Sequence, residues 1–168
     1  MFFQTLADFE NWFDVESEKV KLEGVVSQTG PFIRPTAEPG EPPWAVKWLI
    51  FFKGKYLRLN ENYYPKSSRS GGGAYRAHFS YHYGNIPPKR QGSLAWQKEE
   101  QVDFRIDLDV RIGPHIHFKG ENHLPQSRVS GLQISDQTMF TFINSIQDHR
   151  KSGTPIETVF GFKVEPVK

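Results

Sequence analysis

The sequence concentrates residues with acid–base and charge-neutralising chemistry in the stretch R-x-D-x-D-x-R-x-G-P-H-x-H-x-K between positions 105 and 119. Imidazoles transfer protons near neutral pH, a carboxylate can orient an imidazole, and guanidinium or ammonium groups neutralise phosphate charge. Side chains two residues apart along a strand project from the same face, with Cα atoms roughly 7 Å apart. We therefore expect one solvent-facing surface to carry the candidate catalytic residues, which are Arg105, Asp107, His115, His117 and Lys119.

A second strand, predicted over 75–83, extends this surface. Its sequence YRAHFSYHY alternates with period two, so polar and apolar residues fall on opposite faces. Arg76, His78 and His82 lie on the predicted polar face. If this strand neighbours the strand predicted at 103–111, the three side chains lie beside the histidine pair and are candidate substrate-binding residues.

The preferred mechanism is a metal-independent cleavage of RNA. His117 removes the proton of the 2′-hydroxyl and His115 protonates the leaving oxygen, two roles that the sequence leaves interchangeable. Arg105 and Lys119 neutralise charge on the phosphorane, and Asp107 holds one imidazole in the required tautomer. Such a site uses no metal and no cofactor, so we expect activity to be bell-shaped around neutral pH and to survive EDTA.

A metal site is an alternative that the same histidines allow. His115, His117 and Glu121 have the H-x-H-x3-E spacing of the first cupin motif, and His123 lies near. Three such ligands with an open coordination position suit Fe, Mn, Ni or Zn. A cupin also needs a second histidine motif further along the chain, where His149 is the only remaining histidine.

A non-catalytic binding module is the third interpretation. Six bases and no acid lie between Lys66 and Lys98, although the formal net charge of the chain is only +2. Clustered cations attract phosphate groups whatever the nucleotide sequence. A basic, aromatic surface of this kind would dock a nucleic acid or a protein without changing it.

Composition restricts the other function classes. The 168 residues include no Cys, which excludes disulfides, thiolate metal sites and a cysteine nucleophile. Fourteen Phe, six Tyr and four Trp exclude wholesale disorder, because disordered chains are poor in aromatic residues. The sequence has no apolar run near the ~20 residues of a membrane span and no basic leader before an apolar stretch. We therefore expect a cytoplasmic protein without a membrane partner.

Periodicity and chain-breaking residues predict the elements that position these side chains. Apolar residues at three- and four-residue spacing predict a helix near 3–13, with Thr5 and Asp8 as a capping box. Two strand-like runs, 45–52 and 55–63, flank Lys53-Gly54 and predict a hairpin. The other expected elements are strands at 21–28, 75–83, 103–111, 115–119 and 157–164, loops at 30–43 and 84–100, and a helix at 136–150 capped by Ser135 and stopped by Gly153.

Strands bracketed by helices, without βαβ alternation, predict an α+β fold. We expect a single domain over 1–168, built on an antiparallel sheet of about five to seven strands with the N-terminal and C-terminal helices packed on one face. The other face of such a sheet is solvated, which agrees with the polar alternation. The expected core residues are Phe9, Trp12, Phe104, Ile106, Leu108, Phe142, Ile143 and Ile146.

The polar strands resemble a family of small toxins. The runs YRAHFSYHYGN and FRIDLDVRIGPHIHFKG are similar to the Tyr-rich strand, the FRYDN-like strand and the Pro-His-x-His element of the TumE-type toxins of prokaryotic toxin–antitoxin pairs. The similarity spans residues 45–150, and this chain differs by Leu108 after Asp107 and by longer loops. It implies a toxin-like or defence-related protein that acts on RNA and binds a cognate antitoxin. The residues implicated by the resemblance are Tyr75, Arg76, Arg105, Asp107, His115 and His117.

Overall fold

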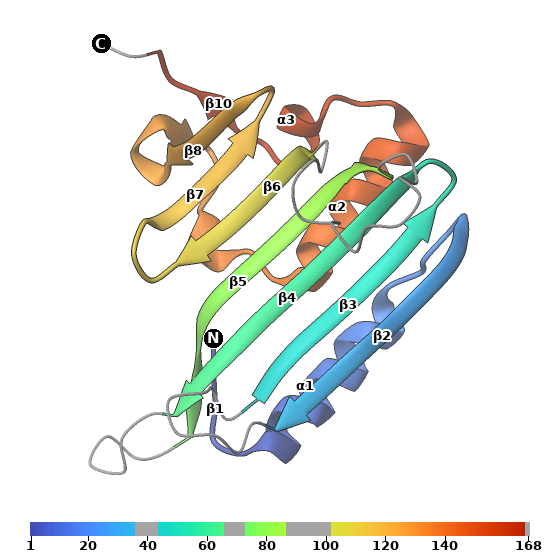
Figure 1. Cartoon of the computed structure of the whole chain (residues 1–168), viewed down its shortest axis with the longest axis vertical. Coiled ribbons are helices and arrows are strands. Elements are labelled where there is room, and N and C mark those ends of the chain that lie inside the picture. The colour runs from blue at the N-terminus through green and yellow to red at the C-terminus, as the bar shows by residue number, and fades with distance from the viewer. Residues whose placement is uncertain (36–43, 66–72, 87–101, 167–168) are drawn as a thin grey trace, which may run out of the picture.

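The computed structural model describes residues 1–35, 44–65, 73–86 and 102–166, whose elements are arranged as in Figure 1. The helices are α1 (Leu6–Lys19), α2 (Met139–Ser152) and α3 (Ile156–Val159). The strands are β1 (Phe2–Phe3), β2 (Val25–Pro35), β3 (Trp44–Phe52), β4 (Lys55–Pro65), β5 (Ala74–Asn85), β6 (Val102–Asp109), β7 (Gly113–Phe118), β8 (Glu121–Pro125), β9 (Val129–Ser130) and β10 (Lys163–Val164).

Eight of these strands form one antiparallel sheet. Its order is β2-β3-β4-β5-β6-β7-β8, so each strand pairs with the next one along the chain, and β1 pairs with β5. β9 and β10 form a separate two-stranded sheet. Both α1 and α2 lie behind the large sheet in Figure 1. The predicted α+β fold with the helices on one face is therefore confirmed, and β1 brings the strand count to one above the expected range.

The core lies between the two long helices and the inward face of the sheet. Phe9 of α1 and Phe142 of α2 are fully buried, and the Phe142 ring stacks on Phe104 of β6 with a centroid distance of 6.0 Å. The helices meet through Phe140, whose ring centroid lies 5.1 Å from that of Phe13. Of the other expected core residues, Ile106, Ile143 and Ile146 are buried, whereas Trp12 and Leu108 are only partly buried.

Both long helices begin at threonines that form capping boxes. The Thr5 hydroxyl accepts from the Asp8 amide at 3.1 Å and the Thr5 amide donates to the Asp8 carboxylate at 3.0 Å, as the sequence predicts. α2 begins after Thr138 rather than after Ser135, because Ser135 lies in a separate 3-10 turn and Thr138 forms the reciprocal pair with Thr141. The helix ends at the predicted Gly153.

β2 is longer than the sequence predicts. The expected strand ends at 28 and the expected loop starts at 30, yet β2 continues through Gly30 and Pro31 to Pro35. Its register with β3 shifts twice, which accommodates these residues in an edge strand. Gly30 has a φ of +95°, and a Cβ there would lie 2.6 Å from the Lys47 carbonyl oxygen. Gly30 and Pro31 therefore mark an irregularity within the strand rather than its end.

The C-terminal segment does not form the strand predicted at 157–164. Ile156–Val159 form α3 instead, and only Lys163–Val164 pair, with β9. The rings of Phe160 and Phe162 pack on Phe104 with centroid distances of 4.8 Å and 5.5 Å. The apolar residues that suggested a strand are therefore aromatic side chains that close the core over β6.

None of the helices among the described residues is long and apolar enough to cross a membrane. Much of the basic stretch between Lys66 and Lys98, and most of the loops predicted at 30–43 and 84–100, lie outside the described residues. The predicted polar strands lie within the described residues.

Candidate functional site

The register of β6 and β7 brings four of the predicted site residues together. Asp107 pairs with His115, and Arg105 pairs with His117. The residues between them in each strand are buried in the core. Side chains alternate between the two faces of a strand, so these four project from the face opposite the helices.

Asp107 is the centre of this cluster. Its Oδ2 atom lies 2.5 Å from Arg105 Nε and 3.4 Å from Nε2 of both His115 and His117. The side chain is only 2% exposed, and a buried carboxylate is unfavourable unless cations or donors surround it. Burial raises the pKa of Asp107, but hydrogen bonds from His117 and Arg105 and the Arg105 charge outweigh it and hold the pKa below its ordinary value. Asp107 is therefore an anion that holds an arginine and two imidazoles together.

His115 is held on both sides of its ring. Its Nδ1 lies 2.9 Å from the Gly113 carbonyl oxygen, which can only accept, so Nδ1 carries a proton. Its Nε2 faces Asp107, and the side chain is 2% exposed. The side chain of His117 is 14% exposed and is the more accessible of the two predicted catalytic imidazoles.

His123 is the third imidazole of the cluster. Its ring centroid lies 4.9 Å from that of His115 and 4.7 Å from that of His117. One ring nitrogen of each of the three residues lies within 4.8 Å of the others. Partial desolvation, and then the neighbouring imidazoles, lower the pKa of the exposed His123. The sequence indicated only that His123 lies near the pair.

A bulge in β8 explains why spacing does not reveal His123. Phe118 pairs with Glu121 across the turn, and regular pairing from there would put His123 opposite Ile116, on the core side. Instead Ile116 pairs with Leu124, so β8 contains one extra residue, and His123 has a φ of +55°. The extra residue brings the His123 ring to the histidine face. Sequence patterns do not reveal a bulge at a residue other than glycine.

Glu121 does not join the histidines. It pairs with Phe118, a core residue, and forms an ion pair with Arg128 at 3.4 Å. Paired residues share a face, so Glu121 lies on the side of the hairpin away from His117. The H-x-H-x3-E interpretation is therefore wrong for this chain, and the third position beside the histidine pair belongs to His123.

β5 contributes a buried histidine beside the cluster. His82 Nε2 lies 2.7 Å from Ser80 Oγ, and His82 Nδ1 lies 3.0 Å from Arg58 Nη2. His82 is 2% exposed, so it links β4 to β5 rather than facing solvent as a predicted substrate-binding residue would. His78 is partly exposed further along the same face, with its Nδ1 3.3 Å from Asn62 Nδ2.

A β-bulge exchanges the faces predicted for Tyr75 and Arg76. On β4, Asn62 pairs with His78, but the next residue, Tyr63, pairs with Arg76, so Ala77 is an extra residue in β5. Tyr75 is consequently 44% exposed and Arg76 only 7% exposed. The prediction that Arg76 lines the polar face is wrong.

Arg76 belongs to a charge network in the core. Its Nη1 lies 3.2 Å from Glu61 Oε1, and its Nη2 donates to the Ser135 carbonyl at 2.7 Å. The hydroxyls of Tyr63 and Tyr81 donate to the same Glu61 carboxylate. Arg76 therefore anchors the segment before α2 to the sheet.

Lys119 also lies away from the cluster. It sits in the turn between β7 and β8 with a φ of +50°, and its Nζ lies 2.6 Å from Glu157 Oε1 of α3. The side chain is 67% exposed. The prediction that Lys119 shares the surface of His115 and His117 is wrong, because the strand ends at Phe118.

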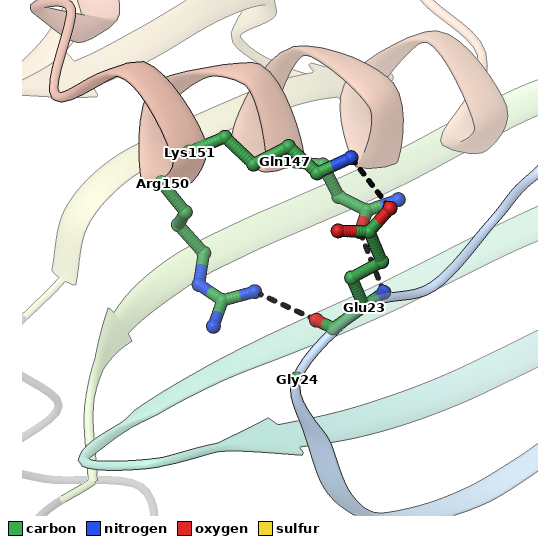
Figure 2. A pocket seen from close by; sticks show the side chains of 5 residues that line it. All are labelled: Glu23, Gly24, Gln147, Arg150 and Lys151. Carbon is green, nitrogen blue, oxygen red and sulfur yellow. Dashed lines mark hydrogen bonds and ion pairs between the residues drawn. The ribbon is translucent and has the colours of Figure 1, made fainter.

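A shallow pocket of about 220 Å³ lies at a different place, near the end of α2 (Figure 2). Gln147 Oε1 accepts from the Glu23 amide at 2.9 Å, and Lys151 Nζ donates to Glu23 Oε1 at 2.8 Å. Arg150 donates to the Glu23 carbonyl at 3.2 Å and packs on the ring of Phe52. These contacts fasten the segment between α1 and β2 to α2, so the pocket has a structural explanation.

No family model, curated protein or solved structure matches this chain. The chemistry of the polar face is therefore inferred from its own residues: Asp107, Arg105 and the three imidazoles of His115, His117 and His123.

Proposed function

We propose that the polar face binds RNA and cleaves its phosphodiester backbone without a metal. The observation that supports this proposal best is the buried Asp107 carboxylate, with an arginine and two imidazoles within 3.4 Å of its Oδ2 atom on the side of the sheet away from the helices. RNA cleavage by the neighbouring 2′-hydroxyl needs proton removal, proton donation and neutralisation of phosphorane charge. These residue types supply all three.

The exposure of each imidazole supports a division of roles within this proposal. His117 and His123 reach solvent, so these two transfer the protons. His115 is a positioning residue, because its Nδ1 contacts Gly113 and its Nε2 faces Asp107. The guanidinium of Arg105 is 34% exposed and neutralises the developing charge.

The TumE resemblance adds the biological setting of the proposal. Under this proposal the protein is a toxin-like or defence-related ribonuclease whose partner is a cognate antitoxin. Genomic context provides an independent check, because a small adjacent antitoxin-like reading frame is expected. Co-purification of its product with this chain would support the partnership.

The first prediction concerns RNA cleavage. The wild-type protein is expected to cleave a single-stranded RNA oligonucleotide in EDTA, and His117→Ala is expected to lower the rate roughly 10²–10⁴-fold, the usual effect of a proton-transfer group. His149→Ala is the control, since this imidazole lies on α2, on the other side of the sheet, and contacts the Thr154 carbonyl instead of the cluster. Gel electrophoresis of end-labelled RNA measures both rates.

Two outcomes would contradict this proposal. One is full activity of His117→Ala. The other is cleavage of an oligonucleotide that carries a 2′-deoxy sugar at the scissile position, because the attacking hydroxyl would then be missing.

A binding module is the second candidate function. Arg58 pairs with His82 and His82 with Arg105, so both arginines supply positive charge on this face. The exposed Tyr75 lies beside Tyr64, with ring centroids 6.4 Å apart. Aromatic rings and cations together bind single-stranded nucleic acid by stacking and charge attraction. Wild-type protein that binds RNA without cleaving it, and loses affinity in Arg105→Gln, would favour this function.

A further inference from the structure

Three imidazoles on the polar face are close enough to share one ion. A nitrogen of each of His115, His117 and His123 lies within 4.8 Å of the others. Imidazole nitrogens bind Zn²⁺ at about 2.0–2.1 Å, which separates two tetrahedral ligands by about 3.4 Å. Small side-chain rotations, chiefly of the exposed His123, would close the remaining gap.

The hydrogen bonds of His115 orient its ring as in a metal ligand. Its Nδ1 proton contacts the Gly113 carbonyl oxygen at 2.9 Å, so in the neutral ring the lone pair is on Nε2. That Nε2 lies 3.4 Å from the Asp107 carboxylate. In that tautomer the lone pair faces a carboxylate whose charge only Arg105 offsets among the described residues, and a metal cation bound to Nε2 would turn this repulsion into attraction. A metal-bound histidine commonly donates a hydrogen bond from its other ring N–H to a backbone carbonyl, a carboxylate or water.

The backbone conformation of His123 also supports a metal site. A φ of +55° is uncommon for a residue other than glycine, and such conformations concentrate at functional sites. Here the β8 bulge that contains this residue brings the third imidazole to the other two. Regular pairing of β7 and β8 would have kept His123 on the core side.

We propose that His115, His117 and His123 bind one divalent transition-metal ion, with the Asp107 carboxylate beside it as the balancing charge. A set of three imidazoles selects Zn²⁺, Co²⁺ or Ni²⁺ over Mg²⁺ and Ca²⁺, which prefer oxygen ligands. This site goes beyond the proposed ribonuclease. One consequence rests on that function: an ion bound to His117 and His123 occupies the lone pairs that proton transfer needs, so it inhibits cleavage.

The test is a metal titration of the full chain after EDTA treatment and dialysis. Calorimetry with Zn²⁺, and visible absorption with Co²⁺, are expected to show one ion per chain. His123→Ala and His117→Ala are expected to weaken binding by more than the roughly 10–100-fold that loss of a neighbouring partner costs. His78→Ala and His149→Ala are the controls, because both imidazoles lie outside the cluster, and their affinity is expected to equal that of the wild type.

The proposal is overturned if the wild type binds less than one ion per chain, or if His123→Ala binds Zn²⁺ as tightly as the wild type. His123 is exposed, so its variant is expected to keep the wild-type circular dichroism spectrum. The titration is independent of RNA cleavage. A cleavage rate unchanged by saturating Zn²⁺ would contradict the roles of His117 and His123 in proton transfer, while the metal site would stand.

Discussion

Asp107 shows what a single buried charge contributes on this face. The carboxylate is 2% exposed although it lies on the side of the sheet that the helices do not cover. Burying a charge costs several kcal/mol, which the partners of Asp107 offset only when all of them are in place. Its neighbours are consequently fixed in position before any ligand arrives, as the proposed chemistry requires.

Asp109 provides a residue-scale prediction about pH. Its carboxylate accepts hydrogen bonds from the backbone amides of Arg111 at 2.7 Å and Ile112 at 3.1 Å. These hydrogen bonds lower the pKa of Asp109 below the ordinary value of about 4. A folded-state pKa that is below the unfolded-state pKa stabilises the fold at pH values above the unfolded-state pKa. This stabilisation is lost as the pH falls through the folded-state pKa. Asp109→Ala is therefore expected to lower the free energy of unfolding at pH 7 by about 1 kcal/mol.

Urea denaturation of both proteins at pH 7 and pH 3 checks this prediction. The difference between wild type and Asp109→Ala is expected to shrink at pH 3, which lies below the ordinary pKa at which the carboxylate of the unfolded chain takes up a proton. Asp109→Asn keeps an acceptor without the charge and should fall between the two proteins at pH 7. A difference of equal size at both pH values would show that the charge makes no contribution.

At the scale of elements, two bulges decide which side chains form the site. The one in β5 moves Arg76 to the core and Tyr75 to the surface, and the one in β8 brings His123 to the histidine pair. Each adds one residue, and one residue reverses every later side chain of a strand. The alternation of polar and apolar residues does not show where a bulge lies. A glycine at the extra position would have been a sequence signal, and neither bulge has one.

Segments whose strand pairing is regular around the site could be predicted from the sequence. The alternation predicted over 103–111 placed Arg105 and Asp107 on one face, although β6 ends at Asp109, and the Thr5 capping box marked the start of α1. Tertiary packing explains the failures elsewhere. Thr138 replaces Ser135 as the cap because the Arg76 guanidinium binds the Ser135 carbonyl in a turn before the helix.

The Arg76 network gives an element-scale prediction about stability. Arg76→Met leaves the fully buried Glu61 carboxylate without its cation, so the free energy of unfolding is expected to fall by about 3–5 kcal/mol. Urea denaturation measures the change. The double variant Glu61→Gln/Arg76→Met removes both charges and is expected to recover part of the loss, since a glutamine can still accept from Tyr63. A loss below about 1 kcal/mol in the single variant would show that water replaces the arginine.

In the whole molecule, the sheet has the hydrophobic core on one side and the proposed site on the other. One face packs against α1 and α2, and the other carries the polar cluster. The imidazoles of the cluster come from β7 and β8, and β8 is the last strand of the sheet in Figure 1. Phe118 of β7 packs on Phe104 of β6, with ring centroids 5.9 Å apart, and both rings belong to the same core as the helices. A ligand at this edge should therefore affect the unfolding of the whole chain.

The last prediction uses this coupling. An ion that binds only the folded chain stabilises it by about 2.7 kcal/mol at a concentration 100 times its Kd. For a chain of this size each kcal/mol raises Tm by roughly 2–4 °C, so saturating Zn²⁺ is expected to raise Tm by roughly 5–10 °C. Differential scanning calorimetry of the wild type and His123→Ala measures it, with no rise expected in the variant. A bound ion that leaves Tm unchanged would mean that the β7–β8 hairpin opens before the rest of the sheet and independently of it.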